Sequence, residues 1–350
     1  MIGHEIYMQR CLELAALGAG NVAPNPMVGA LLVHNDTIIA EGFHEQFGRA
    51  HAEVNCINNV PAELYQLVKE SRLYVSLEPC NHFGKTPPCT DLIIKHKIPT
   101  VVIACTDPFE KVNGSGIKKL KEAGVNVITG IMDTAALELN RRFFTFHKKQ
   151  RPYIILKWAQ SNDLKIASSD HTRVMISNEL TNRLVHKWRA EEAAIMVGSR
   201  TALQDDPSLT TRLWPGNDPV RIVIDKNLEL PAHLHLFDKT VPTIILNNLR
   251  QEEDGNNNYY KTGNNENIIA VTISILRLRN LVSLIVEGGA TLLQSFIDLG
   301  CWDEARVITN KNMNIGNGIA APVLKNEVLI KKEQLLDDEI SIYRNAAGSL

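Results

Sequence analysis

The sequence predicts two α/β domains in one chain of 350 residues. A chain of this length exceeds what one hydrophobic core ordinarily supports, so two domains are expected. Short apolar strands alternate with segments whose apolar residues have helical spacing, which is the pattern of α/β folds. A basic segment that ends in proline, His147 to Pro152, follows an apolar helix, and the hydrophobic pattern begins again after it. We therefore expect domains at residues 1–148 and 150–350, with the boundary near residue 149.

The first domain begins with apolar positions at helical spacing, which predict a helix over residues 4–17. Asn35-Asp36 is a hairpin turn signal between two apolar runs, so strands are expected at residues 30–33 and 37–40. The other expected strands are residues 73–77, 100–105 and 125–129, and the other expected helices are residues 51–57, 88–95, 117–123 and 134–148. This alternation predicts largely parallel pairing in the later part of the sheet.

The second domain shows the same alternation. Helices are expected over residues 178–189, from Gly198 onward, and from Gly288 to Leu299. The expected strands are residues 153–158, 193–197, 220–225, 243–246, 283–286, 306–309 and 340–343. Residues 251–266 are rich in Asn, Gly and Glu, so we expect a long, mobile polar loop there.

Composition excludes several classes of protein. The net charge of −2 provides no basic footprint for a nucleic acid backbone. No apolar run is long enough for a transmembrane helix, and the N-terminus does not resemble a secretory signal. Six cysteines in this length do not form a disulfide framework, so a cytoplasmic location is expected. The four cysteines other than Cys80 and Cys89 are expected to be buried free thiols: Cys11, Cys56, Cys105 and Cys301.

Three potential metal ligands occur in a recognisable order: His51, Cys80 and Cys89, with Glu53 two residues after the histidine. One imidazole and two thiolates are ligands that zinc prefers, and a catalytic zinc keeps its fourth position open for water. Zinc lowers the pKa of bound water from about 15.7 to about 7, so hydroxide is available at neutral pH. Zinc-dependent base deaminases have this order, and their glutamate transfers protons without binding the metal.

The alternative interpretation of these residues is two buried thiols and a core histidine. The spacing is itself unusual, because eight residues separate Cys80 from Cys89 where the deaminase signature has two. The inserted loop carries Lys85, which suggests a substrate with an anionic group such as a phosphate.

Residues 1–150 resemble the deaminase domain of the bifunctional riboflavin-biosynthesis deaminase/reductase family. The matching segments are Pro24-Asn25-Pro26-Met27-Val28-Gly29, Glu41-Gly42-Phe43-His44, His51-Ala52-Glu53-Val54, Leu77-Glu78-Pro79-Cys80 and Gly84-Lys85-Thr86-Pro87-Pro88-Cys89. The resemblance implies a cytidine-deaminase-like three-layer α/β/α fold. It also implies that His51, Cys80 and Cys89 hold zinc and that Glu53 is catalytic. The implied substrate contacts are Asn25 to the pyrimidine, and His44, Lys85 and Asp107 to the ribosyl phosphate. Phe109 departs from the family, where Asn is common.

The resemblance continues through residues 150–325 with the family's reductase domain. The matching segments are Lys157-Trp158-Ala159-Gln160-Ser161, residues 197–212, Arg221-Ile222-Val223-Ile224-Asp225 and Val286-Glu287-Gly288-Gly289. A dihydrofolate-reductase-like fold and NADPH are implied. The implied cofactor-binding residues are Ala159, Thr201, Asp205, Gly289, Ala290 and Thr291. The implied substrate-binding residues are Arg189, Leu209, Arg212 and Glu287.

Taken without the resemblance, these residues allow other interpretations. Gly288-Gly289 at a helix start suits phosphate binding, but tight packing of strand and helix explains it equally well. Arg189 could be a solvated helix charge. Two departures concern the reductase half: Leu164 replaces a small residue expected near the cofactor, and the segment from Arg173 to Met175 lacks a common Ser and Trp.

We therefore predict two consecutive reactions of riboflavin synthesis. Zinc hydroxide deaminates 2,5-diamino-6-ribosylamino-4(3H)-pyrimidinone 5′-phosphate, and NADPH then reduces the ribosyl group to ribityl. The resemblance also suggests a homo-oligomer formed through the reductase domains. The alternatives are a deaminase with a degenerate reductase, a nucleic-acid base deaminase, and a structural zinc module joined to a small-molecule sensor.

Overall fold

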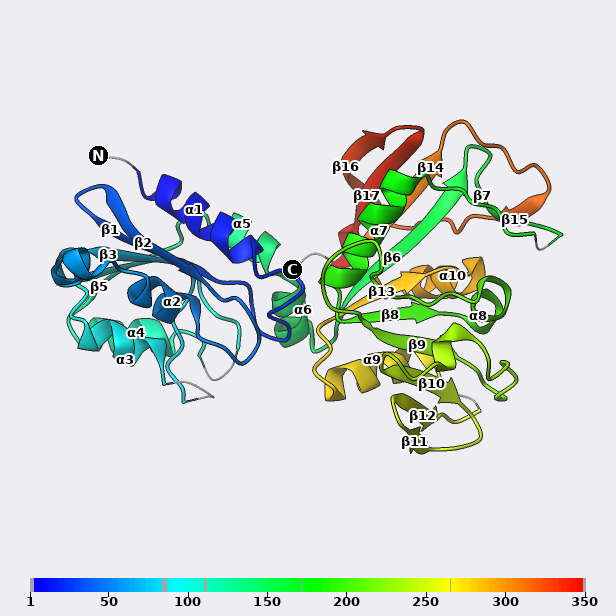
Figure 1. The fold of residues 1–350 in the computed structure, drawn as a ribbon, viewed down its shortest axis with the longest axis horizontal. Helices are drawn as coiled ribbons and strands as arrows, with labels where there is room; N and C mark the ends of the chain where they lie inside the picture. The colour runs from blue at the N-terminus through cyan, green and yellow to red at the C-terminus, as the bar shows by residue number, and fades with distance from the viewer. Residues whose placement is uncertain (1–2, 84–86, 110–111, 171, 265, 349–350) are drawn as a thin grey trace. The chain divides into compact units, whose positions relative to one another are not determined.

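A computed structural model describes residues 3–83, 87–109, 112–170, 172–264 and 266–348 (Figure 1). Contacts divide the chain into two compact units, Met1–Gln150 and Arg151–Leu350. Each unit has its own main sheet and its own hydrophobic cores, one on each face of that sheet. The α/β fold class predicted from the sequence is confirmed in both.

The first unit contains a five-stranded sheet in the order β2-β1-β3-β4-β5. Its strands are β1 (Gly29–His34), β2 (Thr37–Phe43), β3 (Arg72–Leu77), β4 (Thr100–Cys105) and β5 (Asn126–Thr129). Strand β1 pairs antiparallel with β2 and β3, whereas β3, β4 and β5 are parallel to one another. Parallel pairing in the later part of this sheet is therefore as predicted.

Side chains that alternate along these strands enter two separate cores, because successive residues of a strand face opposite sides of the sheet. Leu32 and Val75 pack with one set of helices, whereas Leu31 and Tyr74 pack with the other. The first set is α2 (Ala52–Asn58), α3 (Cys89–Lys95) and α4 (Ser115–Glu122), and the second is α1 (His4–Ala16), α5 (Asp133–Leu139) and α6 (Arg141–Lys149). The unit is thus a three-layer α/β/α sandwich, with a 3-10 segment at Ala62–Glu70.

The single helix predicted over residues 134–148 is wrong, because the structure has two helices that meet at Asn140. The buried Asn140 side chain pairs with the backbone of Met27. Its Nδ2 donates to the Met27 carbonyl at 2.8 Å, and its Oδ1 accepts from the Met27 N–H at 2.8 Å. This long-range pairing explains the interruption, and the local sequence carried no sign of it.

The second unit contains a ten-stranded sheet in the order β11-β12-β10-β9-β8-β13-β6-β14-β17-β16. Its strands are β6 (Tyr153–Ser161), β8 (Ala194–Val197), β9 (Val220–Ile224), β10 (Thr243–Asn247), β11 (Glu252–Asp254), β12 (Asn257–Lys261), β13 (Ser283–Glu287), β14 (Glu304–Asn310), β16 (Glu327–Leu335) and β17 (Asp338–Asn345). The run from β12 to β14 is parallel throughout, and the three other strands pair antiparallel at its ends. Two short strands, β7 (Lys165–Ser168) and β15 (Gly318–Ala320), pair separately.

Alternation along β6 again separates two cores. Ile154 and Leu156 pack with α9 (Ile268–Leu278) and α10 (Ala290–Asp298). Tyr153 and Ile155 pack with α7 (Glu179–Glu191) and α8 (Ser199–Asp205). Neither α9 nor the edge strand β16 is predicted by the sequence pattern.

The long polar loop expected at residues 251–266 is wrong for most of its length, because residues 252–261 form the hairpin of β11 and β12. Gly255 adopts a left-handed conformation (φ 62°) at its turn. Tyr259 is buried, and the Arg250 guanidinium lies 3.9 Å from the centre of its ring. Strand β12 also pairs with β10. A neighbouring strand and one aromatic anchor therefore order a segment whose composition is that of a loop.

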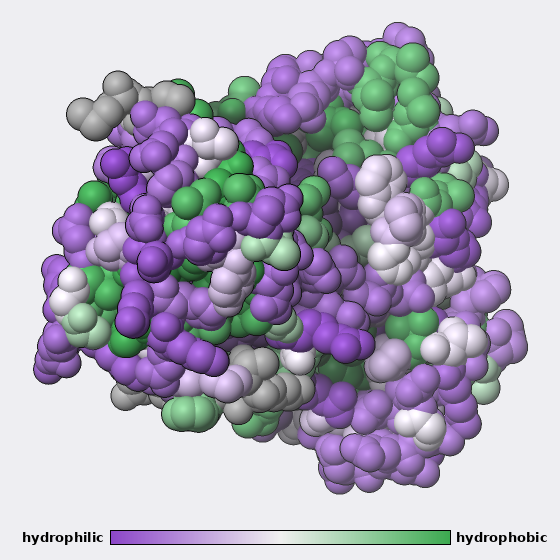
Figure 2. Space-filling view, turned by 60° about the vertical axis from the view of Figure 1, so that its left-hand side comes forward, coloured by the Kyte–Doolittle hydropathy of each residue, from purple (hydrophilic) through white to green (hydrophobic). Residues whose placement is uncertain are grey.

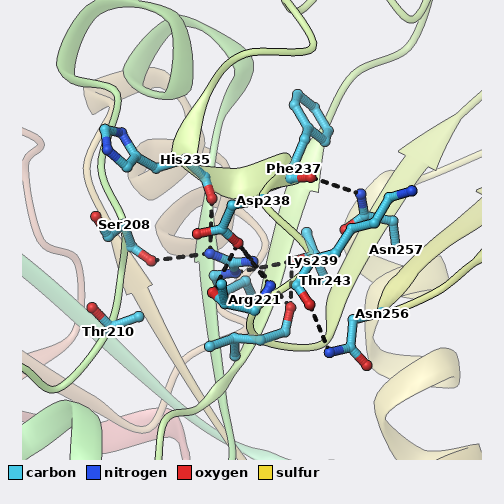
Figure 3. A network of polar contacts seen from close by, with 12 residues as sticks. Ser208, Thr210, Arg221, His235, Phe237, Asp238, Lys239, Thr243, Asn256 and Asn257 are labelled. Atoms are coloured by element: carbon cyan, nitrogen blue, oxygen red, sulfur yellow. Dashed lines mark hydrogen bonds and ion pairs between the residues drawn. The ribbon is translucent and has the colours of Figure 1, made fainter.

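Arg221, on β9, is completely buried and joins several loops of the second unit (Figure 3). Its guanidinium donates to five oxygen atoms: Thr243 Oγ1 (2.9 Å), Asp238 Oδ1 (2.8 Å) and the carbonyls of Ser208 (3.4 Å), His235 (3.0 Å) and Val241 (3.0 Å). A guanidinium has five N–H groups, so each has an acceptor. Arg221 thereby anchors the segment that follows α8.

Hydrophilic side chains cover most of the face seen in Figure 2. None of the helices in the described ranges is long and apolar enough to cross a lipid bilayer. All six cysteines are unpaired, as predicted. Cys301 is partly exposed, which corrects the expectation that it is buried.

Candidate active sites

Three side chains from separate segments of the first unit meet at one point. His51 is the N-cap of α2, Cys80 follows β3, and Cys89 is the first residue of α3. The His51 Nδ1 atom lies 3.5 Å from Cys80 Sγ and 3.4 Å from Cys89 Sγ. The Nδ1 and the two sulfur atoms all lie within 4.8 Å of one another.

This spacing fits a tetrahedral zinc ion. Zinc binds imidazole nitrogen at about 2.0–2.1 Å and thiolate sulfur at about 2.3 Å, so tetrahedral angles separate such ligands by about 3.5 Å. Within the described part of the chain, no fourth His, Cys, Asp or Glu joins the three. Three protein ligands and one open position are the arrangement of catalytic zinc sites, whereas structural sites are closed by four.

The loop that carries Cys80 is held in place by Glu78. The buried Glu78 carboxylate accepts hydrogen bonds from the backbone N–H groups of Asp107 (3.2 Å), Gly114 (3.0 Å), Gly116 (2.9 Å) and Ile117 (3.1 Å). Gly116 lies so close to the Pro79 carbonyl that a Cβ atom there would collide with it. Glycine at this position thus allows α4 to approach the loop that carries Cys80.

The charge distribution in the cluster suits a cation. Contact with the Cys89 thiol, supported by His51, lowers the pKa of Cys80 to about 4 although burial opposes this. Contact with the Cys80 thiolate, together with burial, raises the pKa of Cys89. The hydrogen bond with Cys80 raises the pKa of His51. The site therefore concentrates negative charge on sulfur.

Glu53 lies in the first turn of α2 and is 3% exposed. Burial raises the pKa of its carboxyl group, and the charge of Cys80 raises it further. A carboxyl group whose pKa is moved toward neutrality can both accept and donate a proton at physiological pH. It adjoins His51, Cys80 and Cys89 without belonging to that group of candidate metal ligands.

The other residues predicted for the first unit are distributed around this cluster. His44 is buried, its ring centre is 5.4 Å from that of His51, and its Nε2 lies 3.1 Å from Asn25 Nδ2. Burial lowers the pKa of His44. Asp107 is buried, and burial raises its pKa to about 7. Lys85 lies outside the described residues.

A cavity of about 630 Å³ lies at the carboxyl ends of β6, β8 and β13 in the second unit. Ligands of open parallel sheets bind at this edge. The structure brings together nine of the ten residues predicted for this unit, which all line the cavity: Ala159, Arg189, Thr201, Asp205, Leu209, Glu287, Gly289, Ala290 and Thr291. The tenth, Arg212, is exposed and is not part of the lining.

One wall of the cavity contains a buried ionic cluster. Arg189 donates from Nε and Nη2 to the two Glu287 oxygens, at 2.9 and 2.8 Å, and Lys157 Nζ lies 3.5 Å from Glu287 Oε2. Burial opposes ionisation of Glu287, but Arg189 and Lys157 outweigh it and hold its pKa at about 2. Burial lowers the pKa of Lys157 despite Glu287.

Lys157 received no role from the sequence, although it lines the cavity. A signal was present, because a lysine in the middle of the apolar run from Tyr153 to Trp158 needs a buried partner. That partner is Glu287, which faces Lys157 across the parallel pair of β6 and β13.

The backbone at Gly288 and Gly289 is left-handed (φ 85° and 75°). A Cβ atom on Gly288 would lie 2.9 Å from Thr201 Cγ2, and one on Gly289 would lie 3.1 Å from Thr201 Oγ1. Tight packing against α8 therefore explains both glycines. Both also line the cavity, so a ligand there can approach the backbone closely.

The residues of the second unit that depart from the family pattern differ in their position relative to the cavity. Leu164 is 57% exposed, has a left-handed backbone (φ 58°), and is not among the cavity-lining residues. The expectation that it lies near the cofactor is therefore not supported by the cavity. Arg173 and Met175 do line the cavity.

Two protein-family models match the chain. The one described as the cytidine and deoxycytidylate deaminase zinc-binding region matches residues 1–105, and the one described as the RibD C-terminal domain matches residues 152–327.

Curated proteins and solved structures resemble the chain over nearly its whole length. The riboflavin biosynthesis protein RibD of Aquifex aeolicus is 37% identical, covering 96% of this chain and 97% of that protein. The RibD protein of Bacillus amyloliquefaciens is 40% identical over 86% of this chain and 82% of its own length. A diaminohydroxyphosphoribosylaminopyrimidine deaminase/5-amino-6-(5-phosphoribosylamino)uracil reductase from Thermotoga maritima superposes with a TM-score of 0.89, at 33% identity, covering 97% of this chain and 98% of that one.

Proposed function

Because the chain belongs to the family of the riboflavin biosynthesis protein RibD, we propose that its two units carry the two activities of that family in order. The chain is a bifunctional enzyme, a zinc-dependent deaminase and an NADPH-dependent reductase of riboflavin biosynthesis. We assign deamination of 2,5-diamino-6-ribosylamino-4(3H)-pyrimidinone 5′-phosphate to residues 1–148. Reduction of the ribosyl group to ribityl is assigned to residues 150–350.

In the first unit, His51, Cys80 and Cys89 hold zinc, and their spacing supports this assignment. Zinc, when bound, makes a water molecule acidic enough to act as a nucleophile at neutral pH. Glu53 takes the proton from the attacking water and passes it to the departing amino group, which leaves as ammonia. Its burial beside the ligands and its raised pKa support this role.

Substrate binding in the first unit is assigned to residues around the ligands. Asn25 contacts the pyrimidine, and its position beside His44 and the zinc ligands supports this. Lys85 and Asp107 contact the ribosyl phosphate. His44 lies beside Asn25 and His51 and is assigned to the same substrate-binding region.

In the second unit, NADPH, when bound, supplies the hydride that opens the ribose. The residues assigned to the cofactor line one continuous cavity: Ala159, Thr201, Asp205, Gly289, Ala290 and Thr291. Leu209, Arg189 and Glu287 in the same lining are assigned to the substrate. Arg189 is already paired with Glu287, whereas Arg212 is exposed three residues after Leu209, so we assign the phosphate contact to Arg212.

One observation carries the proposal: His51, Cys80 and Cys89 meet beside the buried Glu53. The second unit of the same chain has a cavity at the carboxyl edge of its sheet. The test is one incubation with the pyrimidine phosphate and NADPH, in which ammonia and NADPH are followed together. Ammonia release followed by an equal loss of NADPH is expected. Ammonia release without NADPH loss would favour a degenerate reductase. The absence of both ammonia release and NADPH loss would refute the proposal.

A deaminase acting on nucleic acid bases is not favoured, because the net charge is −2 and the relatives span both units. A gel-shift assay with transfer RNA is expected to show no complex.

We also propose a homo-oligomer formed through the second units, in the cytoplasm. The exposed edge strand β16 supports the first proposal, because Val328, Leu329 and Ile330 are each about half exposed at the open end of the sheet. Light scattering on the purified protein in solution tests for the oligomer, and a monomer would refute this proposal. Unpaired cysteines suit a reducing compartment.

A further inference from the structure

A buried histidine stands between the zinc ligands and Asn25. The side chain of His44 is almost fully buried, and both of its ring nitrogens have partners. Its Nδ1 lies 3.0 Å from the Ala50 carbonyl oxygen, and its Nε2 lies 3.1 Å from Asn25 Nδ2. The edge of the ring packs against His51. The backbone N–H of His44 is also bonded, to the Val28 carbonyl at 2.9 Å.

These contacts determine which nitrogen of His44 carries the proton. A carbonyl oxygen can only accept a hydrogen bond, so Nδ1 must donate to Ala50. In a neutral imidazole the other nitrogen is then an acceptor. Nε2 therefore requires a donor, and the Asn25 amide supplies one from Nδ2.

The direction of the Asn25 amide follows from this proton position on His44. With Nδ2 turned toward His44, Oδ1 must point away from it, and no described residue donates a hydrogen bond to this oxygen. Asn25 is only partly buried, so Oδ1 remains available to a ligand. If the amide were reversed, two acceptors, Oδ1 and Nε2, would face each other.

We propose that His44 is a positioning residue that turns the Asn25 amide so that its oxygen receives an N–H group of the pyrimidine. This inference rests on the proposed deaminase function and on the assignment of Asn25 to the base. It replaces the expected contact of His44 with the ribosyl phosphate, because both ring nitrogens are occupied within the protein. The pair His44–Asn25 thus favours bases that offer a donor at that point and disfavours bases that offer an acceptor.

The test is a double-mutant cycle on the full-length, zinc-loaded chain, with ammonia release as the readout. His44→Phe keeps an aromatic ring against His51 but removes the acceptor. Loss of the oriented hydrogen bond is expected to raise the deaminase KM about tenfold, with a much smaller change in kcat. His44→Gln, whose amide oxygen can accept from Asn25, is expected to restore most of the loss.

The decisive measurement is His44→Phe in the Asn25→Ala background. If His44 acts through Asn25, the second substitution adds less than about twofold to the effect of Asn25→Ala alone. The zinc content of each variant and its reduction of the deaminated product with NADPH are expected to match the wild type, which controls for folding.

Three outcomes would overturn the inference. A full tenfold effect of His44→Phe in the Asn25→Ala background would mean that His44 meets the substrate itself. Loss of zinc in both His44 variants would mean that it supports His51. An unchanged KM in Asn25→Ala would remove Asn25 from the base. Failure of the proposed function would be distinguishable, because the wild-type chain would then release no ammonia.

Discussion

Glu287 and Arg189 form a two-point ion pair at the wall of the cavity in the second unit, with N–O distances of 2.9 and 2.8 Å. Lys157 approaches the same carboxylate at 3.5 Å. Two cations therefore share one anion in a largely buried setting, which leaves this wall with an excess of positive charge. Such a wall favours anionic ligands, and both the cofactor and the proposed substrate carry phosphate.

This cluster makes the stability of the second unit dependent on acidity. The ordinary pKa of Glu287 is 4.5, and its pKa in the folded chain is about 2. A carboxyl group with a lowered pKa contributes stability above its unfolded pKa, and this contribution is lost as pH falls toward the folded pKa. We expect the urea midpoint of the second unit to decrease between pH 4.5 and pH 2.

Tryptophan fluorescence measures this unit selectively, because all four tryptophans lie in it: Trp158, Trp188, Trp214 and Trp302. In Glu287→Gln the same acid range should have a weaker effect on the midpoint, because no carboxylate remains to be protonated. An identical acid dependence in the variant and the wild type would contradict this assignment.

Replacing Glu53 by glutamine is expected to abolish deamination and to preserve zinc. The amide is nearly the same size but cannot carry the proton, and loss of such a group costs about 10²- to 10⁴-fold in rate. Metal analysis and ammonia release measure the two properties. Reduction of the deaminated product is the internal control. Turnover close to that of the wild type would remove Glu53 from catalysis.

Removal of zinc is expected to separate the two activities. A chelator that withdraws the metal from His51, Cys80 and Cys89 should stop ammonia release, because water then loses its activation. NADPH oxidation with added deaminated product should continue, since the proposed reductase site lies in the other unit. Restoration of ammonia release by added zinc is the control, and a parallel loss of both activities would contradict the separation.

Arg221→Met is expected to destabilise the second unit by about 3 kcal/mol, because several buried acceptors lose their donor at once. The five bonds of Arg221 connect β9 with the segments around Ser208 and Val241. Urea unfolding followed by tryptophan fluorescence measures the change. Arg183→Met, at an exposed arginine of α7, is the matched control and should change stability little. Equal effects of the two substitutions would argue against the network.

Leu164→Gly is expected to stabilise the chain slightly. Leu164 has a left-handed backbone (φ 58°), which costs a residue with a side chain about 1–2 kcal/mol. Glycine avoids this cost but loses about 0.5–1 kcal/mol through its greater freedom in the unfolded state, so a net gain of about 0.5–1 kcal/mol remains. The exposed leucine side chain has little packing to lose. An unchanged KM for NADPH would support its position outside the cavity lining, and a destabilised variant would contradict the strain.

The sequence by itself predicted the group of candidate zinc ligands, His51, Cys80 and Cys89, and the glutamate beside it. Histidine, cysteine and glutamate in this order serve few purposes other than zinc chemistry, so the identities of the residues carry the information. It also determined most strands and helices, because burial of one face leaves a regular hydrophobic period. The α/β class and the positions of β1, β3, β4 and α1 follow from that period.

Tertiary structure alone decided the rest. Asn140 interrupts a helix because Met27 lies beside it, and the polar residues 252–261 form a hairpin because β10 lies beside them. Lys157 meets Glu287 only because β6 and β13 are neighbours in the sheet. Each of these outcomes depends on a contact between residues far apart in the chain. Local propensity and periodicity describe a segment and its near neighbours, so they contain no information about such a partner.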